Sequence, residues 1–198
     1  MTTTANPASG PGEAERRDAL ADRLLTNVIE SMELASVWLG LRLGLYEALR
    51  TQGPATVAEL AERAGVDARY AREWLEQQAV AGLLDVEGPA SDADARRYRL
   101  PAAHAEVLLD ADHPAHAGAT AWWIGSLARV LHRVPDLYRG GQGLPSPKSG
   151  ADGRLAIANF NRPMVVNDLA GWFAAVPELE GRLRAEGARA LDVGCGIG

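Results

Sequence analysis

The sequence predicts a mainly α-helical chain: a winged helix-turn-helix domain with a small β wing, followed by the start of an α/β domain. Three observations carry this prediction. Apolar residues recur at three-to-four spacing over most of the chain, which favours helices. Three short helical segments precede two short strand-like runs, which is the order of a winged helix-turn-helix. A short apolar run then enters a glycine-rich turn at residues 190–198.

Composition excludes several classes of protein. The chain has 198 residues, of which 47% are hydrophobic and 23% charged, as in ordinary globular domains. A net charge of −6 gives no attraction to phosphate backbones or anionic lipid. No apolar run approaches the ~20 residues of a membrane helix. The lone cysteine, Cys195, excludes an internal disulfide. We therefore expect a soluble, cytoplasmic protein without a membrane partner.

The chain divides into four predicted segments. Residues 1–12 have neither the basic start nor the apolar core of a signal peptide, and we interpret them as a disordered leader. Residues 13–109 are the predicted helical dimerisation and winged-helix domain. Residues 110–186 are the predicted helical linker and substrate cap. Residues 187–198 are the predicted first strand and glycine loop of an α/β domain.

The first helical stretch covers residues 13–50, with a break expected near Gly40 and Gly44. Its apolar residues lie on one face at helical spacing; they include Leu20, Leu24, Val28, Met32 and Ala35. Two interpretations of this stripe remain open. It packs against its own domain, or it is the interface of a homodimer formed through the N-terminal helices.

A capping box starts the next helix. The Thr56 hydroxyl can accept the backbone N–H of Glu59, and the Glu59 carboxylate can reach back to the Thr56 N–H. The predicted helix over residues 57–64 ends at Gly65, which suits a left-handed cap.

Asp67 caps a third helix over residues 68–81, which we expect to end at Gly82. Residues 83–86 then read as a strand, and residues 96–100 alternate polar and apolar as its antiparallel partner. Three short helices followed by a two-stranded wing predict a winged helix-turn-helix domain.

Helices dominate the next part of the chain as well. Pro101 favours the start of a helix. We expect helices over residues 102–109, 114–138, 155–176 and 177–186. Pro163 predicts a kink within the third of these.

The residues with most functional information lie at 188–198 and read ARALDVGCGIG. A strand that enters a Gly-x-Gly-x-Gly turn lets the backbone approach a ligand closely, because no Cβ intervenes. The third glycine comes one residue too early for the dinucleotide fingerprint, and the Lys-Ser/Thr of a phosphate loop is absent. The carboxylate of Asp192 suits a ligand with an ammonium group, such as S-adenosylmethionine.

Residues 192–198 resemble motif I of class I S-adenosylmethionine-dependent methyltransferases, whose pattern is acidic-x-Gly-x-Gly-x-Gly. The preceding part is similar to the winged-helix domain found before the catalytic domain in a group of bacterial methyltransferases, some labelled transcriptional regulators. The runs that carry this likeness are LRLGLYEAL at 41–49, AELAERAG at 58–65, REWLE at 72–76, AGLL at 81–84 and YRLP at 98–101. The resemblance covers residues 20–198.

The resemblance implies a cofactor, S-adenosyl-L-methionine, and a Rossmann-like methyltransferase domain. Asp192 would orient the methionine amino group, and Gly194, Gly196 and Gly198 would line the amino-acid and ribose portions. It also implies methyl transfer to a small, partly apolar molecule, with O-methylation expected. In the family the ribose-binding acid and any base follow motif I. We therefore assign no catalytic residue and expect this chain to be an N-terminal part, inactive alone.

An aromatic set in the linker region is the candidate substrate site. Trp122, Phe160 and Met164 could wall an apolar pocket, although they could equally be ordinary core. Asn161 is the first choice for a polar substrate contact, because amides are disfavoured inside helices.

A DNA-binding transcriptional regulator is the rival function. The candidate recognition helix offers Arg69 and Arg72, but also Glu73 and Glu76. Acidic residues outnumber arginines between residues 47 and 99, whereas DNA-binding domains gather positive charge on one face. The one basic cluster is in the wing, at Arg96, Arg97 and Arg99. We therefore do not expect nucleic acid as a partner.

Metal binding and cysteine chemistry have weak support. His113 and His116 lack further ligands at suitable spacing, so no metal site is expected. Cys195 is interpreted as a small residue between two glycines.

Overall fold

The structure, a computed structural model, describes residues 12–89, 91–143 and 150–195. The predicted leader lies outside the described residues except for Gly12, and so do Gly196 and Gly198 of the glycine loop. The described elements are, in order, α1 (Glu13–Arg42), α2 (Leu45–Gln52), α3 (Val57–Ala64), α4 (Ala68–Val80), β1 (Asp85–Glu87), β2 (Arg97–Arg99), α5 (Ala102–Leu109), η1 (Gly118–Ala121), α6 (Trp122–Val130), η2 (Leu131–Arg133), α7 (Val134–Gly140), α8 (Gly150–Ala174) and α9 (Pro177–Arg184).

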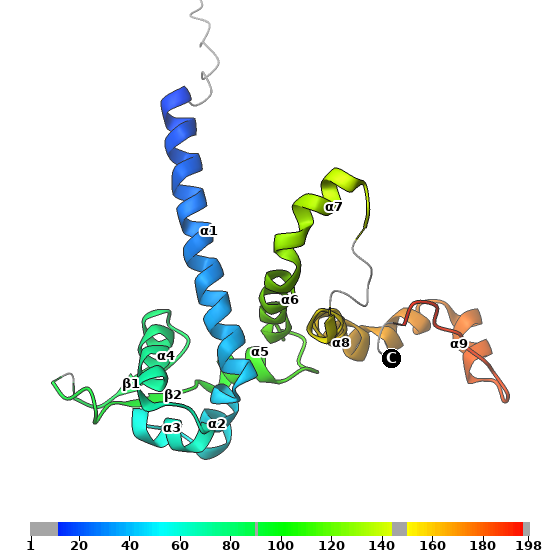
Figure 1. Cartoon of the computed structure of the whole chain (residues 1–198). Coiled ribbons are helices and arrows are strands. Elements are labelled where there is room, and N and C mark those ends of the chain that lie inside the picture. The colour runs from blue at the N-terminus through cyan, green and yellow to red at the C-terminus, as the bar shows by residue number, and fades with distance from the viewer. Residues whose placement is uncertain (1–11, 90, 144–149, 196–198) are drawn as a thin grey trace, which may run out of the picture.

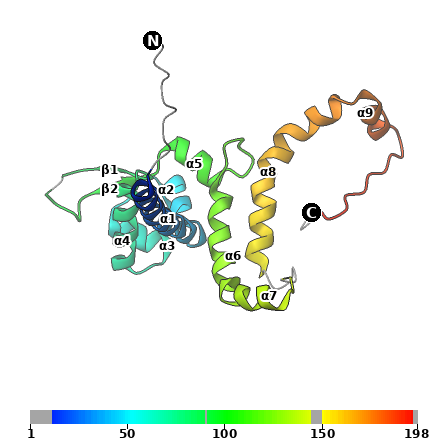
Figure 2. The same cartoon turned by 90° about the horizontal axis from the view of Figure 1, so that it is seen from above.

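The elements form an open arrangement around two helical groups (Figure 1). Helices α2 to α5 and the β1–β2 wing surround the C-terminal end of α1, whose N-terminal half projects away from them. Helices α6 and α8 lie side by side, and α9 lies at the far end of the chain (Figure 2). None of the described helices has the length and apolar character needed to cross a membrane.

The predicted break in the first helical stretch is confirmed. Helix α1 ends at Arg42, and α2 begins at Leu45. Gly44 between them has φ 69°, a left-handed conformation that favours glycine. The chain therefore turns here and packs α2 against the end of α1.

The predicted caps of α3 and α4 are also confirmed. The Glu59 N–H donates to Thr56 Oγ1 over 3.3 Å, and the Thr56 N–H donates to Glu59 Oε2 over 2.8 Å. Gly65 ends α3 with φ 64°. Asp67 Oδ1 accepts the Arg69 N–H over 2.9 Å at the start of α4.

The wing is a two-stranded antiparallel sheet in which Val86 pairs with Tyr98. Its first strand begins two residues later than predicted. The reason is that the N–H groups of Leu83 and Leu84 both donate to the Gln78 carbonyl and extend the end of α4. Tyr98 also exchanges two backbone hydrogen bonds with Ala55, which ties the wing to the segment before α3.

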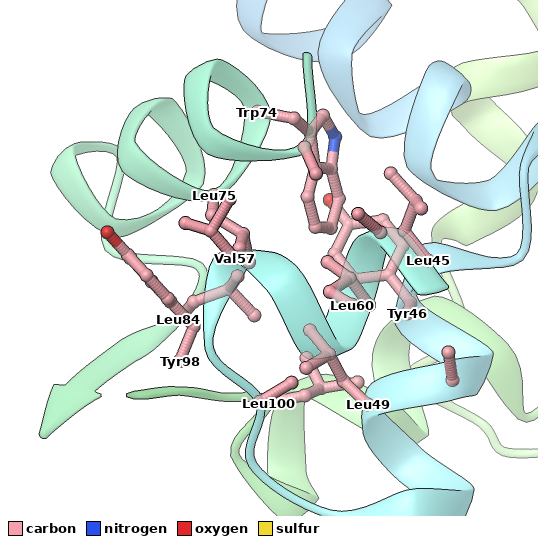
Figure 3. Close-up of a cluster of buried hydrophobic side chains, with 14 of the residues drawn as sticks. Leu45, Tyr46, Leu49, Val57, Leu60, Trp74, Leu75, Leu84, Tyr98 and Leu100 are labelled. Carbon is pink, nitrogen blue, oxygen red and sulfur yellow. The ribbon is translucent and has the colours of Figure 1, made fainter. Parts of the chain in front are cut away.

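One hydrophobic core holds the winged helix together (Figure 3). The labelled side chains come from α2, α3, α4 and the wing: Leu45, Tyr46, Leu49, Val57, Leu60, Trp74, Leu75, Leu84, Tyr98 and Leu100. The Tyr46 ring meets Trp74 edge-on with centroids 5.0 Å apart. The Trp74 indole N–H donates to the Ser36 carbonyl over 3.0 Å, so α1 is fixed to this core.

The linker differs from its prediction, because residues 114–138 do not form one helix. They divide into η1, α6, η2 and α7. Pro135 lies in the first turn of α7, where its missing N–H needs no partner, so it favours the start of a new helix at Val134 instead of the continuation of α6. Helix α8 continues through Pro163 and bends along its course in Figure 2, as the predicted kink requires.

The predicted strand near the end of the chain is not formed in the described part. Residues 188–192 adopt no regular secondary structure, and Leu191 and Val193 are 87% and 86% exposed. A parallel strand needs neighbours on both sides to pair its backbone and cover its apolar faces. The described chain offers this segment none.

Candidate functional site

The described part of the glycine motif is exposed. Asp192 and Gly194 both face solvent, and Gly194 has φ 86°, which supports a turn at this position. A Cβ added to Gly194 would meet no atom within 4 Å. The described residues of the motif therefore do not enclose a ligand and do not form a cofactor site by themselves. Gly196 and Gly198 lie outside the described residues.

The four predicted substrate residues do not line a common described pocket. Phe160, Asn161 and Met164 lie exposed on α8. Trp122 is half-buried at the start of α6, where the Arg42 guanidinium lies over its ring at 5.7 Å from the centroid. A cation over an indole face stabilises the contact of α1 with α6. In the described chain Trp122 thus connects two helices.

A groove with a volume of about 660 Å³ lies between α1 and α6. Most of its lining is apolar; the residues are Met32, Ala35, Ser36, Trp38, Leu39, Ile124, Gly125, Ala128 and Arg129. The spacing of apolar residues predicts the stripe on the first helix but does not predict this groove. Its second wall comes from a helix about ninety positions later, and no local pattern predicts that pairing.

Close backbone approach shapes the floor of the groove. A Cβ added to Gly125 would lie 2.8 Å from Nε1 of Trp38, so only glycine lets α6 come this near. The Trp38 N–H is buried there and has no hydrogen-bond partner among the described residues. At this position the indole of Trp38 packs closely against Gly125, and its N–H group is left without a hydrogen bond in the described chain.

A second hollow of about 430 Å³ lies between α2, the end of the wing and α5. Its polar rim contains Arg50, Arg99, Glu106 and Asp110. Arg50 donates to Glu47 over 2.8 Å, and Arg99 pairs with both acids of β1. The positive groups at this rim are therefore neutralised within the chain.

Several arginines of the winged helix are engaged in ion pairs. On α4, Arg69 pairs with Glu73, and Arg72 pairs with Asp94 in the wing tip and with Glu76. In the wing, Arg97 pairs with Glu59 and also donates to the Pro54 carbonyl over 2.6 Å. These pairs reduce the positive potential where a DNA-binding winged helix would present it.

His113 and His116, the two histidines considered as metal ligands, lie in different surroundings. His113 lies 3.7 Å from Glu106. Burial lowers the pKa of His116, whose Nδ1 has no partner in the described chain. The described residues contain no group of three His, Cys, Asp or Glu side chains that could hold a metal ion.

Asn167, one of the amides on α8, has a structural role. Its Nδ2 donates to the Asp112 carbonyl over 2.8 Å and to the Pro163 carbonyl over 2.7 Å. Arg162 also pairs with Asp112 and lowers the pKa of that carboxyl. Together these contacts fasten α8 to the loop before η1.

The region with the three helices, the two-stranded wing and the C-terminal part of α1 also matches a known family model. Residues 32–109 match the model of the Rv2258c-like winged HTH domain. This confirms the winged-helix prediction made from the sequence. No curated protein sequence matches the chain.

Two solved structures share the wider fold. The structure of PigF with SAH has a TM-score of 0.53 at 21% sequence identity, and the match covers 75% of this chain and 47% of that one. The mitomycin 7-O-methyltransferase MmcR has a TM-score of 0.51 at 25% identity, with 83% and 49% covered. The chain thus spans about half the length of the solved structures it matches.

Proposed function

We propose that this chain is the N-terminal part of an S-adenosylmethionine-dependent methyltransferase that acts on a small, partly apolar molecule, with an oxygen atom as the acceptor. The observation that carries the proposal is the match to a solved O-methyltransferase over 83% of this chain. That match extends well beyond the winged helix. It is joined by the acidic-x-Gly-x-Gly-x-Gly pattern that starts at Asp192.

The described structure supports separate roles for the winged helix with its linker and for the domain that starts at the glycine motif. The winged helix and linker would shape and cover a substrate pocket, while the cofactor site would need strands beyond the glycine motif. Asp192 and Gly194 are exposed and unenclosed in this chain. The cofactor, S-adenosyl-L-methionine, is therefore expected to bind only when further strands pair with residues 188–193.

Binding of SAH, the product of methyl transfer from S-adenosylmethionine, tests the proposal by calorimetric titration. The product of the complete reading frame should bind with a micromolar Kd, and the 198-residue chain should not bind measurably. Asp192→Ala should weaken binding about 10- to 100-fold, because a hydrogen bond to a charged group contributes roughly 1.5–3 kcal/mol. Asp168→Ala, which removes an exposed carboxylate on α8, is the matched control and should leave the Kd unchanged.

Two results would contradict this function. One is a complete product that ignores SAH. The other is a reading frame that encodes no further strand–helix units after residue 198.

The winged HTH match keeps transcriptional regulation as the second candidate. The ion pairs of Arg69, Arg72 and Arg97 argue against it, because these side chains already hold acidic partners. A gel-shift selection from random duplexes at low salt should recover no preferred sequence. Tight binding to one selected site would favour the regulator instead.

A further inference from the structure

The groove between α1 and α6 combines an apolar lining with one charged side chain. Its volume of about 660 Å³ lies within the range of roughly 300–1,000 Å³ that is usual for small-molecule pockets. Arg129 is the one charged residue among the described residues of the lining, and Ser36 adds a hydroxyl. Sites that are mostly apolar with few polar groups orient a ligand through those groups.

One end of the groove is closed by contacts between its two helices. The Arg42 guanidinium lies over the Trp122 ring, and the Trp38 indole packs against Gly125. Residue numbers therefore fall along α1 as they rise along α6, and the chain runs down one helix and up the other in Figure 1. The closed end is the one at Trp122.

The charged side chain lies at the other, open end. Arg129 is one helical turn beyond Gly125 on α6, and Met32 lies nearly two turns before Trp38 on α1. Both Arg129 and Met32 line the groove and are exposed. The groove therefore leads from a positive charge at its mouth to an apolar, closed end.

The positive charge at the mouth is not neutralised by the described chain. Arg129 makes no ion pair or hydrogen bond with any residue that the structure describes, and no acidic residue belongs to the described lining. Arg42 at the closed end, by contrast, is engaged with Trp122. The groove thus favours a ligand with a negative charge at one end.

Charge and shape together select the chemical class of this ligand. A guanidinium presents parallel N–H donors that match the two oxygens of a carboxylate. One positive charge balances one carboxylate, whereas a phosphate monoester carries nearly two charges. The lining from Met32 to Leu39 spans about 10 Å of α1, which suits an extended apolar tail.

We propose that the α1–α6 groove binds a carboxylate with an extended apolar tail, with the carboxylate at Arg129 and the tail directed past Trp38 toward the closed end. The inference rests on the closed end, the apolar lining and the unneutralised charge at the mouth. It needs neither the glycine motif nor methyl transfer, so its failure would leave the proposed function standing.

Calorimetric titration of the 198-residue chain with decanoate tests this site. Decanoate, kept below the concentration at which it forms micelles, should bind at one molecule per chain. Decanol has the same tail without the charge and should bind about 10-fold more weakly, because it loses the charge-assisted hydrogen bonds. From hexanoate to decanoate the Kd should fall about 2- to 4-fold per methylene, as expected when each added methylene is buried.

Arg129→Gln separates the role of the charge from that of the apolar lining. This variant should bind decanoate about 10-fold more weakly and decanol as before. Arg129→Lys keeps the charge and should retain part of the preference for decanoate. Arg182→Gln is the matched control, since Arg182 is exposed on α9 at the far end of the chain (Figure 2) and should leave both Kd values unchanged.

Ala128→Leu tests the apolar part of the groove. Ala128 is exposed and lines the groove, so the larger side chain should occupy part of the space and weaken decanoate and decanol alike. Ala19→Leu adds the same bulk on the exposed surface of α1, about 20 Å before Met32, and should change neither Kd. Circular dichroism should show the same helix content for both variants.

Several results would overturn the proposal. They are the absence of saturable decanoate binding, equal affinity for decanoate and decanol, and an Arg129→Gln variant that binds decanoate normally. Binding only above the micelle concentration would indicate a lipid surface instead. Light scattering of the same solutions reports a second copy of the chain as the occupant: a dimer that takes up no decanoate would overturn the site as well.

Discussion

At Gly40, the approach of α1 to the winged-helix core leaves no room for a side chain. A Cβ there would lie 2.4 Å from Trp74 Cζ2 and 2.6 Å from Tyr46 Cε2. Both rings are packed inside the core, so neither can move aside freely. Glycine at this position therefore sets the distance between α1 and the winged helix.

Gly40→Ala should lower the free energy of unfolding by about 1–3 kcal/mol, because extra volume in a packed core forces neighbours from their preferred positions. Urea unfolding followed by circular dichroism measures the change. Gly171→Ala in α8 is the control, since its Cβ would meet nothing within 4 Å. That variant should be neutral or more stable by up to ~1 kcal/mol. Equal stability of the two variants would contradict the packing argument.

The buried Tyr46 hydroxyl gives the fold a dependence on alkaline pH. Burial, with a smaller effect of Glu33, raises the pKa of Tyr46 well above its ordinary value of 10.0. Its hydroxyl donates to Gln78, which is fully buried. In the unfolded chain this tyrosine ionises near pH 10, whereas the folded chain keeps it protonated. Unfolding therefore releases a proton above that pH, and stability falls as the pH rises.

Tyr46→Phe removes both the hydrogen bond to Gln78 and the ionisable hydroxyl, and urea unfolding at about pH 8 and pH 11 distinguishes these two effects. At pH 8 it should be less stable by ~1–3 kcal/mol, because the Gln78 amide loses its buried partner. Between the two pH values its stability should fall less than that of the parent. Burial also raises the pKa of Tyr98, so part of the slope should remain. An unchanged slope would exclude Tyr46 as its source.

At the scale of elements, the winged helix was predictable because its signals are local. Thr56, Gly65 and Asp67 fix the ends of α3 and α4 through contacts within a few residues, and each of these contacts is present. Strand β1 begins two residues later than predicted, because the Gln78 carbonyl accepts hydrogen bonds from two backbone N–H groups of the turn after α4. That competition depends on how the end of α4 closes, which the strand pattern alone does not reveal.

The capping box offers a direct test at this scale. Thr56→Ala should lower the free energy of unfolding by about 1 kcal/mol, because it removes the side-chain acceptor for the first turn of α3. Thr51→Ala in α2 removes a hydroxyl that donates to the Glu47 carbonyl and has no capping role. It should cost less in the same urea titration. A larger loss at position 51 than at position 56 would refute the assignment of the cap.

The linker was harder to predict, because its breaks come from tertiary contacts as well as from sequence. A Cβ on Gly118 would lie 2.2 Å from the Leu108 carbonyl oxygen, so the chain must pass close to α5 before α6 begins. Pro135 is a sequence signal for a new helix start at α7. The prediction of one helix over residues 114–138 followed the apolar periodicity instead. The groove between α1 and α6 follows from this arrangement and could not be predicted from either helix alone.

At the scale of the whole molecule, the predicted cofactor residues and the predicted substrate residues remain predictions. Asp192 and Gly194 were identified from their spacing, yet a binding site requires neighbouring strands that no local pattern supplies. Phe160, Asn161 and Met164 are exposed on α8, so residue type did not predict a shared pocket.

Hydrogen exchange measured by mass spectrometry should report the state of residues 189–195. In the 198-residue chain their amides should exchange close to the unprotected rate, because no strand partner holds them. Amides of α4 provide the protected reference, since this helix packs into the core. In the product of the complete reading frame, residues 189–193 should become protected. Protection already present in the 198-residue chain would contradict the described exposure.

Helix α1 is one unbroken rod of 30 residues, roughly 45 Å long at 1.5 Å per residue. Trp74 bonds to its backbone at Ser36, so the rod and the winged helix turn together. A small tilt at the anchor therefore becomes a larger displacement at the free end: about 5° at Ser36 moves Glu13 by ~3 Å. A contact that holds the N-terminal end of α1 therefore restricts the orientation of the whole winged helix to a narrow range of angles.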